Sequence, residues 1–424
     1  MGIFERLRIG ETSVWRNRPL WALLISLFIV NVGLGIVVPI LPFYTIEVGA
    51  TPSQLGLLYS SYSLAQFVSA AFWGYMTDRI GARRVIAIGN IGLGISLVIF
   101  GLANQLWLLF AARLLGGTMS GAAVPASLAY AGKTTSSEIR GAAMAMLGAG
   151  IGAGFIIGPA LGGFLGNWGL ATPFFVSASI TIVAAIVAIR VLPRSTPLPD
   201  DGASVSATPE KRLFRFGLST EAKMVLGFFL LAVLIASFGD SFRQSTLALY
   251  SADLFGMDGA DIGLMFTMMG AAYVIVQVLI VGRAVDRFGE GIVLFAGLIL
   301  NGTGFGLLLL AGDFWTLTAT ICLQGAGMAC IHTSVPSMIS KYAGERSGTL
   351  MGFRTMLQNG GRVIGPVLGT RAYEIRASLP YVIGGLIYVV GIVAGIVIYT
   401  ARGLYMRSNP ELVPEPGGVS SHES

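Results

Sequence analysis

Twelve apolar runs, each long enough to cross a lipid bilayer, constrain this chain more than any other feature of its sequence. A helix needs about 20 apolar residues to span the hydrocarbon core. Hydrophobic residues make up 54% of the 424 residues, and charged residues make up only 11%, whereas soluble domains carry about 25% charged residues. The mean hydropathy is +0.77. The predicted spans lie near residues 20–45, 53–76, 84–103, 105–131, 139–166, 172–192, 224–250, 260–283, 289–310, 314–340, 347–370 and 378–401.

The hydrophilic segments between these runs divide the chain. The charged N-terminus lacks the apolar core and cleavage site of a signal peptide, which indicates a leader that stays in the cytoplasm. The predicted parts are a leader (1–19), a first six-helix bundle (20–192), a cytoplasmic linker (193–223), a second six-helix bundle (224–401) and a cytoplasmic tail (402–424).

Lys and Arg residues predict the orientation, because cytoplasmic loops carry an excess of them. Of the 27 Lys and Arg residues, 21 fall on the side of the N-terminus, and only Arg371 and Arg376 fall in loops on the other side. We therefore expect a multi-pass protein of the plasma or inner membrane, with both termini cytoplasmic.

The two halves of the chain repeat each other. The segment GYMTDRIGARR at 74–84 recurs as GRAVDRFGEG at 282–291, and GAGFIIGPALGG at 152–163 recurs as NGGRVIGPVLGT at 359–370. The predicted fold is therefore an all-α membrane protein with twelve transmembrane helices in two pseudo-symmetric six-helix bundles. Such a repeat places the substrate path between the halves, near the bilayer midplane. The repeat pairs Asp78, Gly117 and Pro159 with Asp286, Gly325 and Pro366.

Four motifs resemble those of one transporter family. They are the loop GYMTDRIGARR, the segment LGIVVPILP at 34–42, Arg113 followed by LLGG, and the glycine-proline pattern that starts at Gly154. In these the chain resembles the major facilitator superfamily, and within it the twelve-span drug:proton antiporter family. The resemblance implies alternating access and proton-coupled efflux of small lipophilic or drug-like molecules. The sequence departs from the family pattern at Gly116, where the motif has Gln, and at Asn31, where some drug antiporters have a carboxylate.

The resemblance implies a conformational gate at the loop between spans 2 and 3. A carboxylate there would meet the start of span 11 and gain from its helix dipole. A simpler interpretation is that these charges only set the topology. The candidate gate residues are Gly74, Asp78, Arg79, Gly81, Arg83, Arg84, Asp286 and Arg287.

Glycines at intervals of four in span 5 predict one smooth helix face for close packing, and a proline bends the helix there. The same pattern recurs in span 11. The packing-motif residues are Gly154, Gly158, Pro159, Gly162, Gly163, Gly361, Gly365 and Pro366.

Charges inside spans are costly and usually face a cavity or a partner. Asp240 is the only acidic residue deep in a span, and we predict that it carries the proton. Arg113 resembles the motif arginine tied to proton coupling. The alternative is a structural ion pair of Asp240 with Arg243 or Arg362 that never titrates.

Other polar residues within the spans are candidates for the substrate cavity. His332 could titrate near neutral pH, although a lone intramembrane histidine is often only a packing residue. The predicted cavity residues are Asn31, Tyr62, Gln66, Arg243, Gln244, His332, Arg354, Gln358 and Arg362.

Several classes of function are disfavoured. The basic residues form no patch for nucleic acid. Zinc-protease, nucleophile-elbow and phosphate-loop motifs are absent, so we expect neither an enzyme nor ATP-driven transport. The expected partners are a small-molecule substrate, protons and the lipid bilayer, with no cofactor or metal, and the protein is expected to be a monomer. A proton-coupled carrier of an organic anion or metabolite and a non-transporting receptor remain open as alternatives.

Overall fold

The computed structural model describes residues 18–135, 137–192, 220–343 and 347–408, and these residues are almost entirely helical. All twelve predicted spans are helices. Most of the predicted leader, linker and tail lies outside the described residues. The first half contains α2 (Arg18–Glu47), α3 (Pro52–Ile80), α4 (Ala82–Gly101), α5 (Leu106–Thr134), α6 (Ser137–Gly166) and α7 (Thr172–Val191). The second half contains α8 (Thr220–Phe255), α9 (Gly259–Val276), η2 (Gln277–Val281), α10 (Gly282–Phe288), α11 (Glu290–Leu308), α12 (Phe314–Ala343), α13 (Ser347–Ile375) and α14 (Leu379–Ser408).

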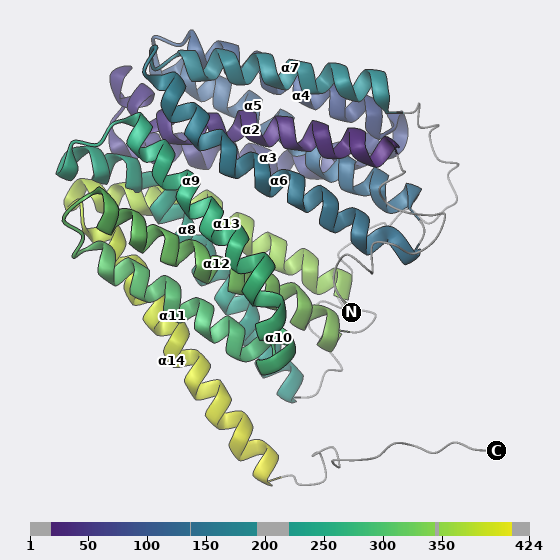
Figure 1. The fold of residues 1–424 in the computed structure, drawn as a ribbon, viewed down its shortest axis with the longest axis vertical. Coiled ribbons are helices and arrows are strands. Elements are labelled where there is room, and N and C mark those ends of the chain that lie inside the picture. The colour runs from purple at the N-terminus through teal and green to yellow at the C-terminus, as the bar shows by residue number, and fades with distance from the viewer. Residues whose placement is uncertain (1–17, 136, 193–219, 344–346, 409–424) are drawn as a thin grey trace.

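The helices form two bundles that follow the chain order (Figure 1). In the first bundle α2 packs on α6 and α7, and α4 packs on α5. In the second, α8 packs on α13 and α14, and α11 packs on α12. The bundles meet mainly where α6 packs on α9 and where α3 packs on α13. The predicted pair of six-helix bundles is confirmed.

The backbone repeats between the bundles as the sequence does. Gly81 ends α3 at φ +83°, and Gly289, its counterpart 208 residues on, ends α10 at φ +81°. Side chains rarely adopt this conformation, so glycine suits both turns. The two signature loops therefore share one backbone geometry.

The bundles touch at one end of the molecule and separate at the other. We call the end where α7 stops and α8 starts the linker end, and the opposite one the far end. At the far end a Cβ built on Gly163 would lie 2.5 Å from the Gly259 carbonyl oxygen. Near the linker end Gly74 and Gly352 have nothing within 4 Å of such a Cβ. The two groups of helices accordingly diverge toward the linker end in Figure 1.

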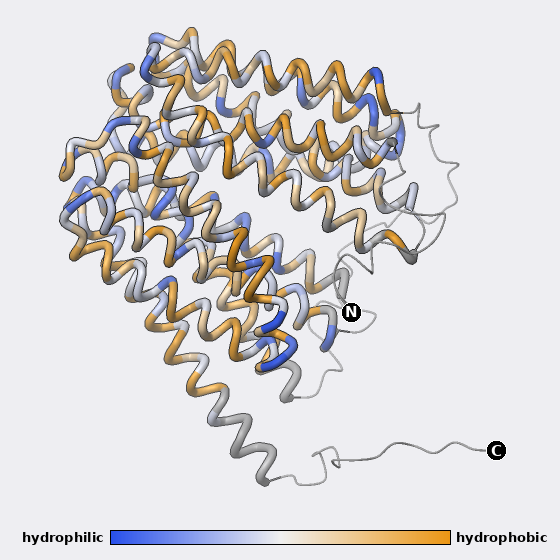
Figure 2. The backbone as a smooth tube through the Cα atoms, in the orientation of Figure 1, coloured by the Kyte–Doolittle hydropathy of each residue, from blue (hydrophilic) through white to orange (hydrophobic). Residues whose placement is uncertain are grey.

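Apolar residues run along the lengths of most helices, and hydrophilic ones gather mainly at the helix ends (Figure 2). Within the described residues, ten spans are long and apolar enough to cross a membrane by composition alone. The helices that fall short are α3 and α13, which pack against each other. Both carry polar residues along their length, including Gln66 on α3 and Arg354 and Arg362 on α13.

The eighth span is not a uniform α-helix. Helices α9, η2 and α10 form one rod interrupted by a five-residue π-helical turn at Gln277–Val281. Gln277 Nε2 donates a hydrogen bond to Thr333 Oγ1 of α12 at 2.6 Å. Such π-turns are often found at functional sites, and the apolar pattern of the sequence did not predict this one.

Candidate functional site: the central cavity

A cavity of about 600 Å³ lies between the two bundles. Its size falls within the usual range of small-molecule sites, which is roughly 300–1,000 Å³. Both halves contribute to its wall, which is mostly apolar and aromatic. The polar and charged lining residues include Tyr59, Tyr62, Gln66, Arg113, Asp240, Arg243, Gln244, Asn301, Gln324, His332 and Arg362.

An ion pair on α8 supplies the acidic group of the cavity. Arg243 Nη2 donates to Asp240 Oδ1, three residues earlier on the same helix face. Arg243 Nη1 also contacts the Met269 sulfur at 2.9 Å. The Arg243 side chain is 9% exposed and that of Asp240 is 24% exposed, so the carboxylate is the member of the pair that a proton from the cavity reaches more readily.

Arg113 forms a second polar centre in the first half. Its guanidinium lies 4.8 Å from the Phe100 ring centroid and 5.4 Å from that of Tyr62. Its Nε and Nη2 atoms are buried without a hydrogen-bond partner in the described part of the chain, as is the Tyr59 hydroxyl. Aromatic faces thus stabilise this cation in place of a carboxylate.

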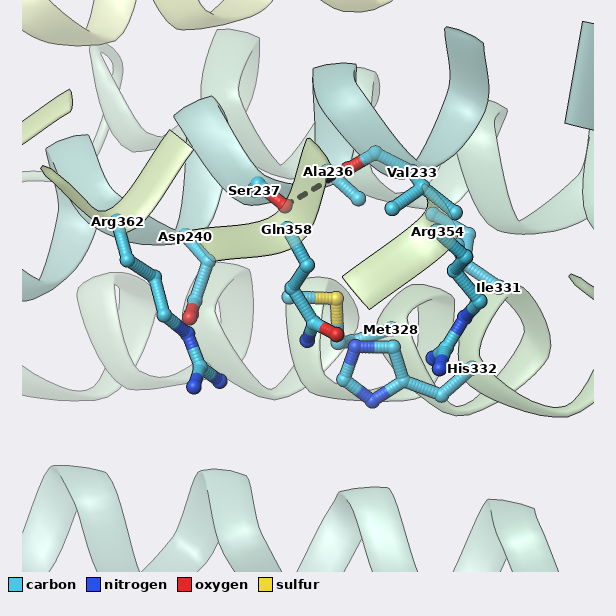
Figure 3. Close-up of a pocket in the computed structure, with 10 residues that line it drawn as sticks. All are labelled: Val233, Ala236, Ser237, Asp240, Met328, Ile331, His332, Arg354, Gln358 and Arg362. Atoms are coloured by element: carbon cyan, nitrogen blue, oxygen red, sulfur yellow. Dashed lines mark hydrogen bonds between the residues drawn. The ribbon is translucent and has the colours of Figure 1, made fainter. Parts of the chain in front are cut away.

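A row of polar residues follows one face of α13. Arg354, Gln358 and Arg362 recur at intervals of four, which places them on one side of a helix. They line a small pocket together with Asp240 and His332. Figure 3 shows these five side chains pointing into the same space.

His332 lies on α12 and lines both the small pocket and the main cavity. Its Nδ1 is 3.5 Å from the Tyr273 hydroxyl oxygen, and the two rings are arranged edge to face. The histidine is therefore held by a tyrosine of α9, across the interface between two helices.

The predicted cavity residues divide into those that line a cavity and one that does not. Tyr62, Gln66 and Gln244 line the main cavity. Asn31 is not among the lining residues: it is 2% exposed and donates a hydrogen bond to the Leu27 carbonyl at 2.7 Å. It faces Gly154 of α6, because the tight α2–α6 contact turns this side of α2 away from the cavity.

The candidate gate residues lie at the linker end. Asp78 and Arg79 occupy the last turn of α3, Gly81 is the turn itself, and Arg83 and Arg84 begin α4. Asp286 and Arg287 occupy the corresponding last turn of α10. Gly74 faces open space, because nothing lies within 4 Å of its Cβ position.

The packing-motif glycines contact helices of their own half. On α6, a Cβ built on Gly158 would lie 2.7 Å from both Gly35 Cα and the Val32 carbonyl oxygen of α2. On α13, Gly361 and Gly365 pack in the same way on α8. Gly163 is the exception, since it contacts α9 of the other half.

Sequence analysis missed Gln324, which lines the cavity from α12. Both of its side-chain amide atoms are buried without a partner among the described residues. The signal was present in the repeat, because the pair Gln324-Gly325 stands 208 residues after Gly116-Gly117. The glutamine that the family motif has at Gly116 thus occurs in the second half. The described residues contain no His, Cys, Asp or Glu cluster that could hold a metal ion.

A cavity that is enclosed by two membrane-spanning bundles, closed at one end and open at the other, defines a multi-pass membrane transporter. Comparison with known proteins agrees with this class. The family model described as Major Facilitator Superfamily matches residues 23–239 and 229–421. The chain belongs to this superfamily.

Curated relatives and solved structures align over nearly the whole chain. Multidrug resistance protein 2 of Bacillus subtilis (strain 168) is 27% identical over 383 residues, covering 90% of this chain and 96% of the relative. Quinolone resistance protein NorA of Staphylococcus aureus (strain COL) is 25% identical, covering 86% and 92%. The crystal structure of the nucleoside transporter NupG has a TM-score of 0.72 at 16% identity, covering 90% of this chain and 98% of that one. That structure shares the fold.

Proposed function

We propose that this protein exports small lipophilic or drug-like molecules from the cell in exchange for protons. The observation that carries the proposal is Asp240, an ionisable carboxylate in a largely apolar cavity between the two halves. Two relatives that align with nearly the whole chain are named for resistance to multiple drugs and to quinolones. Their names support the export of drug-like molecules.

The ion pair suggests how a proton could be coupled to movement. Ionised Asp240 holds Arg243 against α8. Protonation would remove that attraction and free Arg243, so that its remaining contacts with Met269 and the ring of Phe266 on α9 decide its position. A movement of Arg243 would change the contact between α8 and α9, which both line the cavity from the second half. Rocking of one half against the other would begin at this contact.

The orientation proposed from the loop charges places the linker end in the cytoplasm, in the cell membrane. The cavity would then open inward, and a substrate would enter it from the cytoplasm. In the outward-open state the linker ends would close, bringing the signature loop with Asp78 to the start of α13 as the proposed gate. The 20–192 and 224–401 units would move as the two rigid halves, working as a monomer.

The proposal is tested with the full-length protein in proteoliposomes that contain a trapped pH-sensitive dye. A proton gradient is imposed, and lipophilic cations, neutral drugs and organic anions are added in turn. We expect at least one of these compounds to drive proton movement through the wild-type protein and Asp240→Asn to abolish that movement. Asp313→Asn serves as a matched control, because Asp313 lies in the exposed turn that starts α12. Proton movement that persists in Asp240→Asn would exclude Asp240 as the carrier.

A further inference from the structure

The charges that line the two cavities are strongly unbalanced. Within the described residues, four arginines and one aspartate line them. The Asp240 charge is paired with Arg243. This leaves Arg113, Arg354 and Arg362 with no carboxylate partner among the described side chains. A positive charge inside a membrane protein without a countercharge is costly, and a bound anion would relieve that cost.

Arg354 has unused hydrogen-bonding capacity, as Arg113 does. Its Nε is buried and has no partner in the described part of the chain. Gln358 lies between Arg354 and Arg362 on the same face of α13 (Figure 3). An arginine offers five donors in a planar arrangement that matches a carboxylate or phosphate. This face of α13 therefore presents a continuous row of donors to the pocket.

The pseudo-symmetric face in the first half has the opposite character. The offset of 207 residues that relates Pro159 to Pro366 places Leu147, Ile151 and Phe155 of α6 at the positions of Arg354, Gln358 and Arg362. Ile151 and Phe155 line the main cavity. The corresponding helix of the first half, α6, has apolar residues at these positions. The fold therefore does not require the arginines of α13.

The two faces belong to different parts of the cavity wall. Helix α6 packs on α2 and α9, whereas α13 packs on α8 and α3. The main cavity thus has an apolar wall on α6 and Arg362 of α13, and Arg362 also lines the small pocket that contains Arg354. A ligand that satisfies both has an anionic group at one end and an apolar body.

We propose that the transported compounds are amphiphilic organic anions or zwitterions, whose anionic group binds Arg354 and Arg362 and whose apolar body packs against α6. This substrate class deepens the proposed export function and rests on it. A purely cationic compound would enter a site where cations already outnumber the single carboxylate, so the site selects against it.

The test uses three fluorescent probes that differ in charge but share one apolar body. They are dansyl-phenylalanine, which carries a carboxylate, its neutral methyl ester, and its choline ester, which carries a quaternary ammonium. Binding to the purified full-length protein in detergent is followed by fluorescence anisotropy. We expect the carboxylate to bind about tenfold or more tightly than the choline ester, because hydrogen bonds to charged groups each contribute roughly one to two factors of ten.

Variants of α13 assign the preference to its arginines. Arg354→Gln/Arg362→Gln should weaken carboxylate binding by about tenfold or more and leave the choline ester no weaker. Arg354→Lys/Arg362→Lys should keep the order of the three probes. The control is Arg283→Gln on α10, whose arginine is exposed and bonds only its own helix backbone in the described structure. If the double glutamine variant elutes as aggregate, the single Arg362→Gln replaces it, since Arg362 is exposed to the cavity.

Two results would overturn the inference. One is a choline ester that binds the wild-type protein as tightly as the carboxylate. The other is a preference for the carboxylate that survives removal of both arginines. Proton movement driven by each probe in proteoliposomes separates this inference from the export function. Movement driven only by the choline ester would keep the exporter and overturn the anion site, whereas anion-selective binding without any movement would keep the anion site and refute export.

Discussion

At the scale of single residues, the site depends on how a few charges are compensated within a membrane protein. Asp240 and Arg243 neutralise each other, whereas Arg113 is held by aromatic rings. These are two different solutions to the same cost, since a buried charge needs either a countercharge or a polarisable partner. Asp240 therefore keeps its proposed role as the proton carrier, and Arg113 stays a candidate for proton coupling that has no carboxylate partner among the described side chains.

The ion pair leads to a prediction about stability. Arg243→Gln leaves the Asp240 charge without its partner, so we expect it to lower the melting temperature more than Asp240→Asn/Arg243→Gln does. Removing one member of a partly buried pair is worse than removing both, and residues in contact couple by roughly 0.5–3 kcal/mol. Thermal unfolding of the purified protein in detergent at pH 7 compares both variants with the wild type. Equal losses in the single and double variants would show that the pair contributes nothing to folding.

At the scale of helices, close packing of α6 on α2 determines the shape of the first half. The glycine face lets the two backbones approach to a distance that no larger residue permits. Pro159 lies within the same contact, where its ring approaches Gly35. The packing also explains why Asn31 of α2, which faces the glycine side of α6, is buried. Ile151 and Phe155 lie on another side of α6 and line the cavity.

Gly158→Ala tests this packing. The added methyl group would lie 2.7 Å from Gly35 Cα and the Val32 carbonyl oxygen, and both are backbone atoms that cannot rotate away. We expect the free energy of unfolding to fall by about 1–3 kcal/mol, the usual cost of overpacking, seen as a lower melting temperature in detergent. Gly141→Ala on the same helix is the control, because nothing lies within 4 Å of its Cβ position. If Gly158→Ala and Gly141→Ala had the same melting temperature, close packing of α6 on α2 at Gly158 would not contribute to stability.

At the scale of the whole molecule, the structure is one of the two states that alternating access requires. The halves are joined at the far end, where Ser53 of α3 donates hydrogen bonds to Glu374 of α13, the one from its backbone N–H being 2.8 Å long. Those bonds hold the pKa of the Glu374 carboxyl below its ordinary value near 4.5. Because the pKa is lowered in this state, the contact of Glu374 with Ser53 stabilises the closed far end at neutral pH. This stabilisation is lost as the pH falls through the lowered pKa.

Glu374→Gln should therefore shift the protein toward the state that is open at the far end. Spin labels at Leu102 and Leu310, two exposed positions in corresponding far-end turns, report the opening by pulsed electron resonance in a variant without Cys322 and Cys330. We expect a larger population of long distances in Glu374→Gln than in its parent, and a similar increase in the parent as the pH falls through the lowered pKa of Glu374. Gly56→Val should increase it further, because a Cβ there would lie 2.6 Å from the Pro366 carbonyl oxygen of the other half. Unchanged distances in both variants would mean that these contacts do not control the far end.

The sequence alone determined the class of fold. Apolar runs of the length of a bilayer can only be helices that cross it, and the recurrence of the Asp78 loop and the Pro159 motif about 208 residues later indicates two related bundles. Intramembrane charge, which is rare because it is costly, also pointed to Asp240, Arg354 and Arg362 as site residues. These are local properties of the chain, and each can be recognised without knowing what packs against what.

Tertiary structure decided everything that depends on contacts between distant segments. The side of α2 that carries Asn31 could face either the cavity or α6, and only the glycine packing settles which. The π-turn at Gln277 and the unpartnered amide of Gln324 are likewise set by neighbouring helices. The state of the transporter is also invisible in the sequence, since the same residues must be compatible with both states. Contacts at Gly56 and Gly163 show that the far end is closed here, whereas Gly74 and Gly352 near the linker end have nothing within 4 Å of an added Cβ.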